Sequence, residues 1–188
     1  MAEAILRARL AERAPEVVVG SAGLLFDGRE AERATLKALA RQGYELEGHT
    51  ARTISAELLA PASLILGMER QHVRKVVELD PAFFARTFTL PELVQAARIV
   101  GARRGDEDLR TWAERIGSLR NPADYALEDR QSEVADPYGR SGRAYRVAVE
   151  TIERSIDALV ELAWPTPPSD DDVAPATSGG IHADRDRR

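Results

Sequence analysis

The chain has 188 residues, of which 44% are hydrophobic and 30% charged, and its formal net charge is −5 at pH 7. This composition fits one globular domain with a tail, and the negative balance argues against a protein that binds nucleic acid or an anionic membrane. The sequence contains no cysteine, which excludes disulfides, thiolate metal sites and a cysteine nucleophile among these residues.

Other classes of protein are also disfavoured by the sequence. The histidines His49, His72 and His182 are too far apart along the chain to suggest a metal site, and we expect neither a metal nor another cofactor. No apolar run approaches the roughly 20 residues of a membrane helix, and no charged-then-apolar leader is visible. We therefore expect a cytoplasmic protein with no membrane or nucleic-acid partner. The oligomeric state is left open.

Amphipathic helical patterns alternate with short apolar runs along the first 164 residues. The apolar runs predict strands at Glu16–Gly20 and Ser63–Met68, both typical of strands covered on two faces, and a third short strand at Ala85–Phe88. This alternation predicts an α/β fold with a parallel sheet. The predicted helices are Met1–Arg13, Arg29–Arg41, Ile54–Leu59, Glu69–Glu78, Thr89–Val100 with Thr89 as its cap, Asp106–Leu119 and Ser141–Trp164.

Two features of this pattern are irregular. Helical sequence begins at Met1 itself, without the Ser, Thr, Asp or Asn that usually caps a helix start. A wound α/β domain ordinarily begins with a strand, and a sheet of two or three strands has little interior.

The last part of the chain has a different composition. Residues Pro165–Arg188 contain several prolines, an acidic run at Asp170–Asp172 and almost nothing apolar. Such a segment cannot bury enough surface to offset the entropy of ordering it. The expected organisation is a folded domain over residues 1–164 and a disordered tail over residues 165–188.

The segment Val134–Arg140 is the strongest candidate for chemistry. Pro137 disfavours the helical conformation for Asp136, and Gly139 permits a sharp turn after the aromatic Tyr138. The expected product is a carboxyl group on a stiff loop beside an aromatic ring, which suits a general acid. An ordinary Asp-Pro turn near a helix start explains the same residues.

Five segments, taken together and in order, resemble the low-molecular-weight protein tyrosine phosphatases. Each is weak alone, but their combined order is specific, and the resemblance extends over residues 1–164. The matching segments are Met1-Ala2-Glu3-Ala4-Ile5-Leu6, Ser21-Ala22-Gly23, His49-Thr50-Ala51-Arg52, Leu64-Ile65-Leu66-Gly67-Met68 and Asp136-Pro137-Tyr138-Gly139.

The resemblance implies a flavodoxin-like three-layer α/β/α fold with a four-stranded parallel sheet in the order 2-1-3-4. In that family the first strand ends in a phosphate loop, Cys-x5-Arg-Ser/Thr, and the first helix follows at once. This sequence begins at the start of that helix, so the strand, the nucleophilic cysteine and the phosphate-binding arginine are expected to be missing. The expectation agrees with the uncapped first helix and the shortage of strands.

The same resemblance implies roles for individual residues. Asp136 matches the general acid, which later acts as the general base for the attacking water. Ser21 and His49 match residues that support the phosphate loop. Tyr138 matches an aromatic wall of the substrate pocket, and Phe26 lies on the loop expected to form the opposite wall. For His49, an ordinary polar residue in a connecting segment is the alternative.

The implied function is dephosphorylation of phosphotyrosine, in a protein or a small aryl phosphate, through a cysteinyl-phosphate intermediate. Without the nucleophile and anion cradle, negligible turnover is expected for the printed chain, and a wrongly placed start is one explanation. A non-catalytic phosphatase-like binding protein and a phosphoarginine phosphatase are the alternatives. An arsenate reductase of this fold needs a relay of cysteines, which these residues do not provide.

The region between residues 96 and 133 is longer than a compact family member needs. It contains the charged segment Asp106–Leu119. We interpret this segment as a helix added to the surface.

Overall fold

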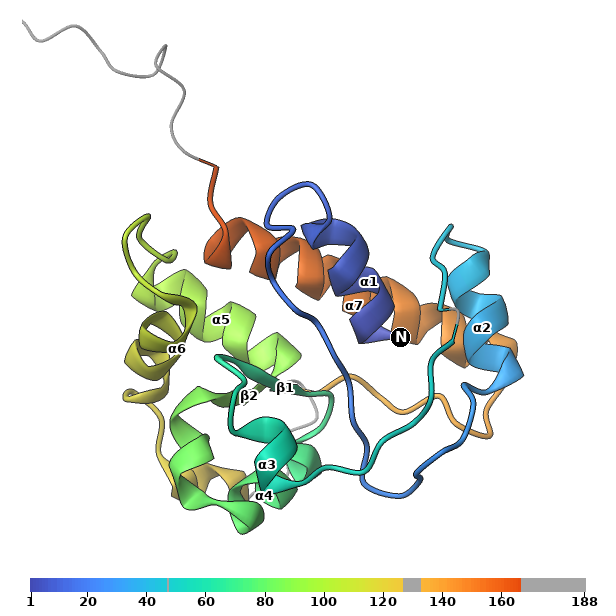
Figure 1. Ribbon diagram of the computed structural model, residues 1–188, viewed down its shortest axis with the longest axis horizontal. Coiled ribbons are helices and arrows are strands. Elements are labelled where there is room, and N and C mark those ends of the chain that lie inside the picture. The colour runs from blue at the N-terminus through green and yellow to red at the C-terminus, as the bar shows by residue number, and fades with distance from the viewer. Residues whose placement is uncertain (47, 127–132, 167–188) are drawn as a thin grey trace, which may run out of the picture.

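The computed structural model describes residues 1–46, 48–126 and 133–166. Seven α-helices, two short 3₁₀ helices and two strands are assigned within these residues, and Figure 1 shows their arrangement. In chain order they are α1 (Ala2–Leu10), α2 (Arg33–Ala40), α3 (Ala56–Leu59), β1 (Ile65–Gly67), α4 (Arg70–Leu79), η1 (Pro81–Arg86), β2 (Thr87–Thr89), α5 (Leu90–Val100), α6 (Leu109–Gly117), η2 (Pro122–Ala126) and α7 (Gly142–Ala163).

The two strands form a parallel sheet, as the sequence predicts. Ile65 lies opposite Thr87 and Gly67 opposite Thr89. The chain returns from β1 to β2 through α4 and η1, because neighbouring parallel strands need a long crossover connection. All three residues of β2 are buried, as expected for a parallel strand covered on both faces. The third predicted strand therefore exists, but it begins at Thr87 rather than Ala85, since η1 extends to Arg86.

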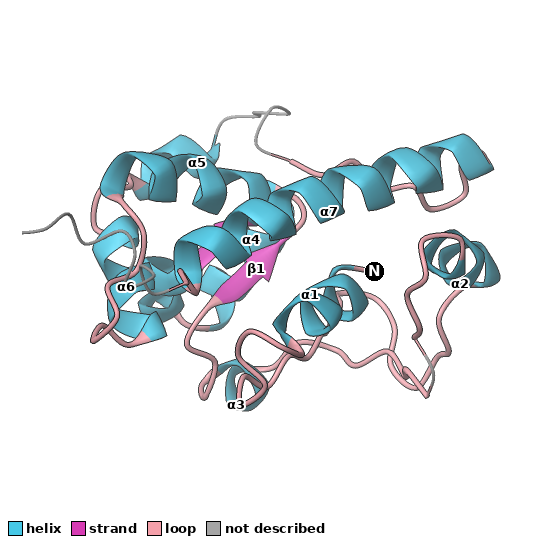
Figure 2. Ribbon diagram, turned by 90° about the horizontal axis from the view of Figure 1, so that it is seen from above, coloured by secondary structure: helices cyan, strands magenta, loops and turns pink. Residues whose placement is uncertain are grey.

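The longest helix, α7, is the platform on which the other helices pack. It contacts α1, α2 and α5, and Figure 2 shows it crossing the molecule with α5 on one side and α1 and α2 on the other. Its inward face repeats at helical spacing, so one continuous apolar stripe meets all three neighbours. The buried members of this stripe include Tyr145, Val149, Ile152, Ile156 and Leu159.

The prediction of a strand at Glu16–Gly20 is wrong. No strand is assigned there, and the side chain of Val18 is 95% exposed, whereas Val17 and Val19 pack against the core. A strand requires a neighbour that takes its ladder hydrogen bonds, and within the described residues no assigned strand pairs with this run. The run is therefore covered on one face only, although its β-branched residues favour a strand.

The interpretation of Asp106–Leu119 as an added surface helix is also wrong. Its helical part, α6, buries Trp112 and Ile116 in the main core, and the Trp112 indole N–H donates to the Gly101 carbonyl over 3.2 Å. A Cβ at Gly117 would lie 2.0 Å from the Ala85 carbonyl oxygen, so α6 packs directly against the η1 backbone. Charged residues on one face of α6 concealed an apolar stripe on the other.

Helix starts agree with the sequence where capping residues are present. Thr89 and Glu92 form the predicted capping box of α5: each side chain accepts a hydrogen bond from the other residue's backbone N–H, at 3.3 Å and 3.1 Å respectively. At α4, Glu69 and His72 form a second box that the sequence did not suggest. His72 is thus a structural residue.

None of the helices in the described residues is long and apolar enough to cross a membrane. Beyond Thr166 the structure describes no residues, so the expected disorder of the tail lies outside the described part of the chain.

The contribution of α1 to the core can be tested by comparing a buried isoleucine on α1 with an exposed one on α5. Ile5 on α1 is 0% exposed, whereas Ile99 on α5 is 85% exposed. Ile5→Val should lower the free energy of unfolding by about 1 kcal/mol, because a buried methyl group is lost, and Ile99→Val should leave it nearly unchanged. Urea unfolding followed by circular dichroism measures both. Equal effects of the two variants would show that α1 is not part of the cooperative core.

Candidate active site

Ser21 and His49, predicted to act together, meet at one carboxylate on α1. The Ser21 hydroxyl donates to Glu3 Oε2, and His49 Nδ1 lies 3.4 Å from the same oxygen. Arg7, one turn along α1, pairs with Glu3 Oε1 and also donates to the Val19 carbonyl over 3.0 Å. The Glu3 side chain is only 10% exposed. Three segments that are distant in sequence are thereby joined at the first turn of α1.

Sequence analysis missed Glu3. It is the acidic residue of an amphipathic first turn, a position typical of a solvent-facing side chain that complements the helix dipole. Glu3 joins distant segments only because the fold brings Ser21 and His49 next to its carboxylate. Burial alone would raise the pKa of Glu3, but the Ser21 hydrogen bond and the charges of Arg7 and His49 overcome it, so its pKa is lowered.

One wall of the candidate site consists of two segments tied by backbone hydrogen bonds. The Gly23 N–H donates to the Arg52 carbonyl over 2.7 Å, and the Ala51 N–H donates to the Arg29 carbonyl over 2.7 Å. This frame carries Phe26, whose exposed ring lies 4.3 Å from the guanidinium carbon of Arg29. A loop anchored at several points can hold an exposed aromatic side chain in place.

The second wall is the loop that carries Asp136. It leaves the end of the sheet, where the Val134 N–H donates to the Met68 carbonyl over 2.8 Å. Asp136 Oδ1 accepts a hydrogen bond from the Tyr138 N–H over 3.0 Å, and Gly139 has a φ of 69°, which glycine tolerates without strain. One carboxylate oxygen of Asp136 therefore holds the turn, while the carboxyl group as a whole stays exposed.

The start of α7 links the second wall to the start of α2. The buried Tyr145 hydroxyl donates to Glu32, the residue before α2. Burial, this bond to Glu32 and the nearby charges of Glu32 and Asp136 raise the pKa of Tyr145 to about 12. Tyr145 thus stays a neutral hydrogen-bond donor at physiological pH. Asp136 lies close enough to Tyr145 to contribute to this shift.

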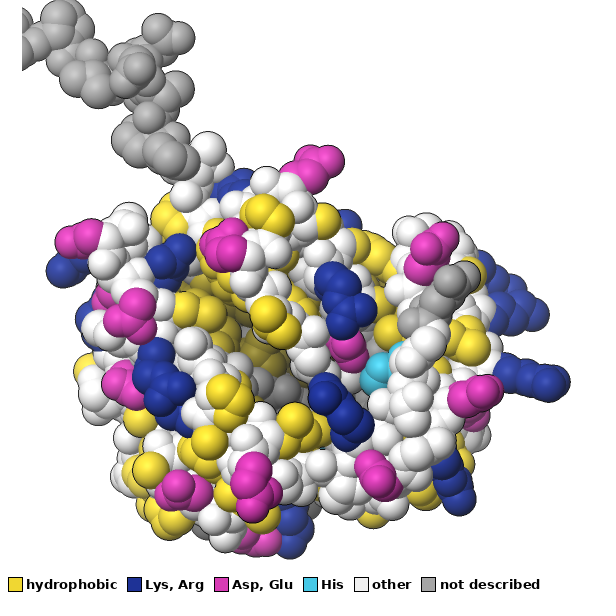
Figure 3. All heavy atoms as spheres, in the orientation of Figure 1, with side chains coloured by type: hydrophobic (Ala, Val, Ile, Leu, Met, Phe, Trp, Pro, Cys, Tyr) yellow, Lys and Arg dark blue, Asp and Glu magenta, His cyan; other side chains and the backbone are white. Residues whose placement is uncertain are grey.

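The two walls lie on either side of the N-terminus. Figure 2 shows the loop entering α7 on one side of the residue marked N, and the loop leading into α2 on the other. Figure 3 shows a hollow in the middle of the molecular face, with hydrophobic atoms in its wall and charged side chains at its rim. Asp136 and Tyr138 share one wall, Phe26 belongs to the other, and Ser21 and His49 gather at Glu3 beside the N-terminus.

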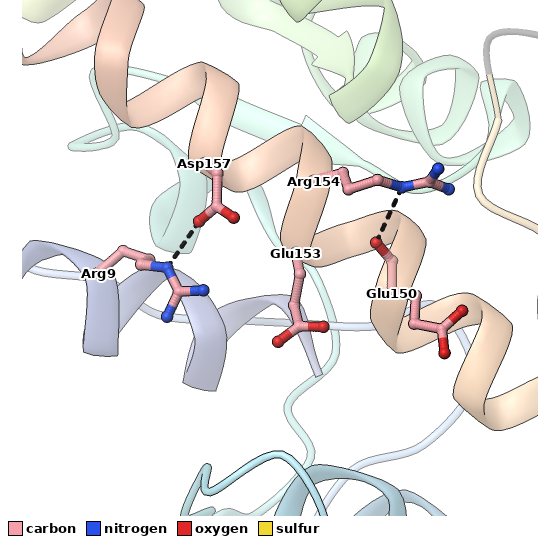
Figure 4. A pocket seen from close by; sticks show the side chains of 5 residues that line it. All are labelled: Arg9, Glu150, Glu153, Arg154 and Asp157. Carbon is pink, nitrogen blue, oxygen red and sulfur yellow. Dashed lines mark hydrogen bonds and ion pairs between the residues drawn. The ribbon is translucent and has the colours of Figure 1, made fainter.

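A separate cavity lies away from these residues. It has a volume of about 410 Å³ and is lined by Arg9, Glu150, Glu153, Arg154 and Asp157, which Figure 4 shows on α1 and α7. Arg9 Nε lies 2.6 Å from Asp157 Oδ1, so one ion pair joins α1 to α7 across the cavity. None of the predicted site residues lines it. We interpret it as a polar groove between packed helices rather than a reaction site.

No group of three or more His, Asp or Glu side chains in the described residues is arranged to hold a metal ion.

Comparison with known proteins establishes the family. The family model described as low molecular weight phosphotyrosine protein phosphatase matches residues 1–100, which is more than half of the chain. The chain belongs to this family. Its parallel sheet with surrounding helices is the α/β fold of that family, so the predicted fold class is confirmed.

Individual relatives agree with this assignment. The probable low molecular weight protein-tyrosine-phosphatase EpsP of Ralstonia nicotianae is 26% identical over 161 residues, covering 85% of this chain and 83% of that protein. Etp of Escherichia coli K12, a low molecular weight protein-tyrosine-phosphatase, is 31% identical over 107 residues, 56% of this chain and 70% of Etp.

Solved structures give the same fold. The low molecular weight protein tyrosine phosphatase from T. tengcongensis is 25% identical with a TM-score of 0.61, over 85% of this chain and 87% of that one. The YwlE arginine phosphatase from Geobacillus stearothermophilus is 26% identical with a TM-score of 0.59, over 85% and 80%.

The lowered pKa of Glu3 leads to a prediction about acid stability. A carboxylate whose pKa is lower in the folded than in the unfolded state stabilises the fold above its unfolded pKa, near the reference value of 4.5. That contribution is lost as pH falls through the folded pKa. Glu3→Gln should therefore lower stability at pH 7 and make the loss of stability on acidification shallower.

Urea unfolding at a series of pH values between about 7 and 3 measures this slope. Glu12→Gln is the matched control, because Glu12 is exposed just beyond the end of α1 and should leave the slope unchanged. If Glu3→Gln and Glu12→Gln gave the same pH profile, the ties to Glu3 would contribute nothing to folding.

Proposed function

We propose that this chain supplies the general acid, the aromatic walls and the supporting residues of a phosphatase that hydrolyses phosphotyrosine or other aryl phosphomonoesters. The observation that carries the proposal is the exposed Asp136 carboxyl group, fixed by its bond to the Tyr138 N–H beside the exposed Tyr138 ring. The chain belongs to a family of phosphotyrosine phosphatases, and the reaction of such an enzyme needs a proton donor for the leaving group. The substrate is therefore a phosphorylated tyrosine side chain or a small aryl phosphate.

In the proposed reaction a cysteine thiolate attacks phosphorus and Asp136 donates its proton to the departing phenolate oxygen. The P–O bond to the ring breaks as the P–S bond of the cysteinyl-phosphate forms. Asp136, now ionised, removes a proton from a water molecule whose oxygen attacks phosphorus, and the P–S bond breaks, releasing phosphate and regenerating the thiolate and the protonated acid. Tyr138 and Phe26 would flank the substrate ring from the two walls.

The thiolate is not provided by these 188 residues, which contain no cysteine. We propose that activity requires a Cys-x5-Arg loop joined to the start of α1, and that the 188 residues alone turn over negligibly. The position of Ser21 and His49, which gather beside the first turn of α1, supports this proposal. A helix start offers N–H groups and a favourable dipole to a phosphate.

A phosphoarginine phosphatase is a second candidate. The observation in its favour is the likeness to the YwlE arginine phosphatase, at 26% identity and a TM-score of 0.59. The two activities need the same acid and differ in the leaving group, a phenolate oxygen against a guanidinium nitrogen. Parallel assays with phosphotyrosine and phosphoarginine discriminate between them.

The role of Asp136 can be tested in a version of the chain that carries an apolar strand and a Cys-x5-Arg-Ser loop before Met1. This version should hydrolyse an aryl phosphate, and Asp136→Asn should lower kcat by about 10²–10⁴-fold, the usual contribution of a general acid. The deficit should shrink for aryl phosphates with acidic phenols, because their leaving groups need no proton. Initial rates against a series of substituted phenyl phosphates measure the effect.

Asp106→Asn is the control, since Asp106 is exposed. The segment between α5 and α6, to which it belongs, lies far from the segment that leads into α7 in Figure 1. It should keep full activity. The 188 residues without the added loop should show no turnover above background. Asp136→Asn with unchanged kcat for poor leaving groups would contradict the assignment of Asp136 as the acid.

A further inference from the structure

Both walls of the candidate site carry exposed arginines. Arg29 and Arg52 lie on the two tied segments of the first wall, and Arg140 and Arg143 follow Tyr138 on the second. The chain as a whole has a net charge of −5, so the positive character is local. Two of the arginines interact with the wall itself: Arg29 stacks on Phe26, and Arg52 donates to the Ser21 carbonyl over 3.1 Å.

Most acidic side chains of the same segments accept hydrogen bonds from other groups of the protein. Asp27 Oδ1 accepts a hydrogen bond from the Thr53 N–H over 3.2 Å, and Asp136 Oδ1 accepts one from the Tyr138 N–H. Glu32, at the start of α2, binds the Tyr145 hydroxyl. Glu30 is exposed and offsets part of the charge. All four arginines are exposed, whereas Asp27, Glu32 and Asp136 each accept a hydrogen bond from the protein.

We propose that this arginine rim, defined by Arg29, Arg52, Arg140 and Arg143, recognises an acidic peptide segment in which the tyrosine to be dephosphorylated is flanked by Asp or Glu residues. The proposal rests on the proposed function for the position of the tyrosine ring, and it adds the substrate class. Opposite charges across the contact raise the association rate and disfavour basic or neutral segments.

The geometry of an extended peptide agrees with a rim on two walls. Successive residues advance about 3.3 Å, so residues two positions before and after the tyrosine lie roughly 7 Å to either side of it. With the ring between Tyr138 and Phe26, one flank of the peptide runs toward the wall with Arg29 and Arg52. The other flank runs toward the wall with Arg140 and Arg143.

A binding experiment on the full 188-residue chain tests this without requiring catalysis. Fluorescence anisotropy compares a labelled Glu-Glu-Tyr-Glu-Glu peptide with Ala-Ala-Tyr-Ala-Ala and Lys-Lys-Tyr-Lys-Lys peptides. We expect the acidic peptide to bind about 10-fold more tightly than the neutral one, as several weak exposed ion pairs together allow. Raising the salt concentration from about 50 to about 300 mM should remove most of that preference.

Variants locate the interaction. Arg29→Gln with Arg140→Gln, one change on each wall, should abolish the preference, whereas the same positions changed to Lys should keep most of it. Arg98→Gln, an exposed arginine on α5, is the matched control and should bind like the native chain. Equal affinity for acidic and neutral peptides, or a preference that survives the double Gln variant, would overturn the proposal.

The result is separable from the fate of the proposed function. If the loop-bearing version fails to hydrolyse aryl phosphates but the acidic preference is present and needs Arg29 and Arg140, the rim stands and the catalytic proposal falls. If hydrolysis occurs but kcat/KM is the same for acidic and neutral phosphotyrosine peptides at low salt, the rim proposal falls and the catalytic one stands.

Discussion

The carboxylate of Glu3 is the point on which the candidate site depends. It lies in the first turn of α1, where it joins Ser21, His49 and Arg7, and Arg7 in turn holds the Val19 carbonyl. A nearly buried carboxylate remains charged only if donors and cations compensate its desolvation, and here they do so well enough to lower its pKa. The same interactions therefore satisfy a buried charge and fix the loops around the N-terminus.

The helix α7 connects Glu3 on α1 to the rest of the candidate site. Its apolar stripe packs against α1, α2 and α5, and its first turns place Tyr145 between Glu32 and the Asp136 loop. The Asp136 loop is also fixed at its other end, where Val134 binds the end of the sheet. An exposed carboxyl group thus sits on a loop held at both ends. That arrangement gives position without burial, which a proton donor to a bound substrate requires.

The sequence predicted well what depends on local pattern. Helical periodicity located α7 and α5, the Thr89–Glu92 box marked a helix start, and the apolar run before Gly67 marked β1. The predictions that were wrong depend on contacts between distant segments. Val17–Val19 has the composition of a strand but pairs with no assigned strand in the described residues. The many charged residues of α6 suggested an exposed helix, although its Trp112 is buried. Glu3 was not predicted for the same reason: it joins Ser21 and His49 only when the fold brings their segments to α1.

The two proposals place different demands on the same loops. Catalysis by Asp136 needs one carboxyl group that can carry a proton, while recognition by Arg29 and Arg140 needs exposed positive charge nearby. These demands fall on different side chains: the Asp136 carboxyl group is held at its turn by the Tyr138 N–H, whereas Arg29 and Arg140 are exposed. Because the loops are anchored through backbone hydrogen bonds, the acid and the arginines can occupy the same segments without taking each other's place.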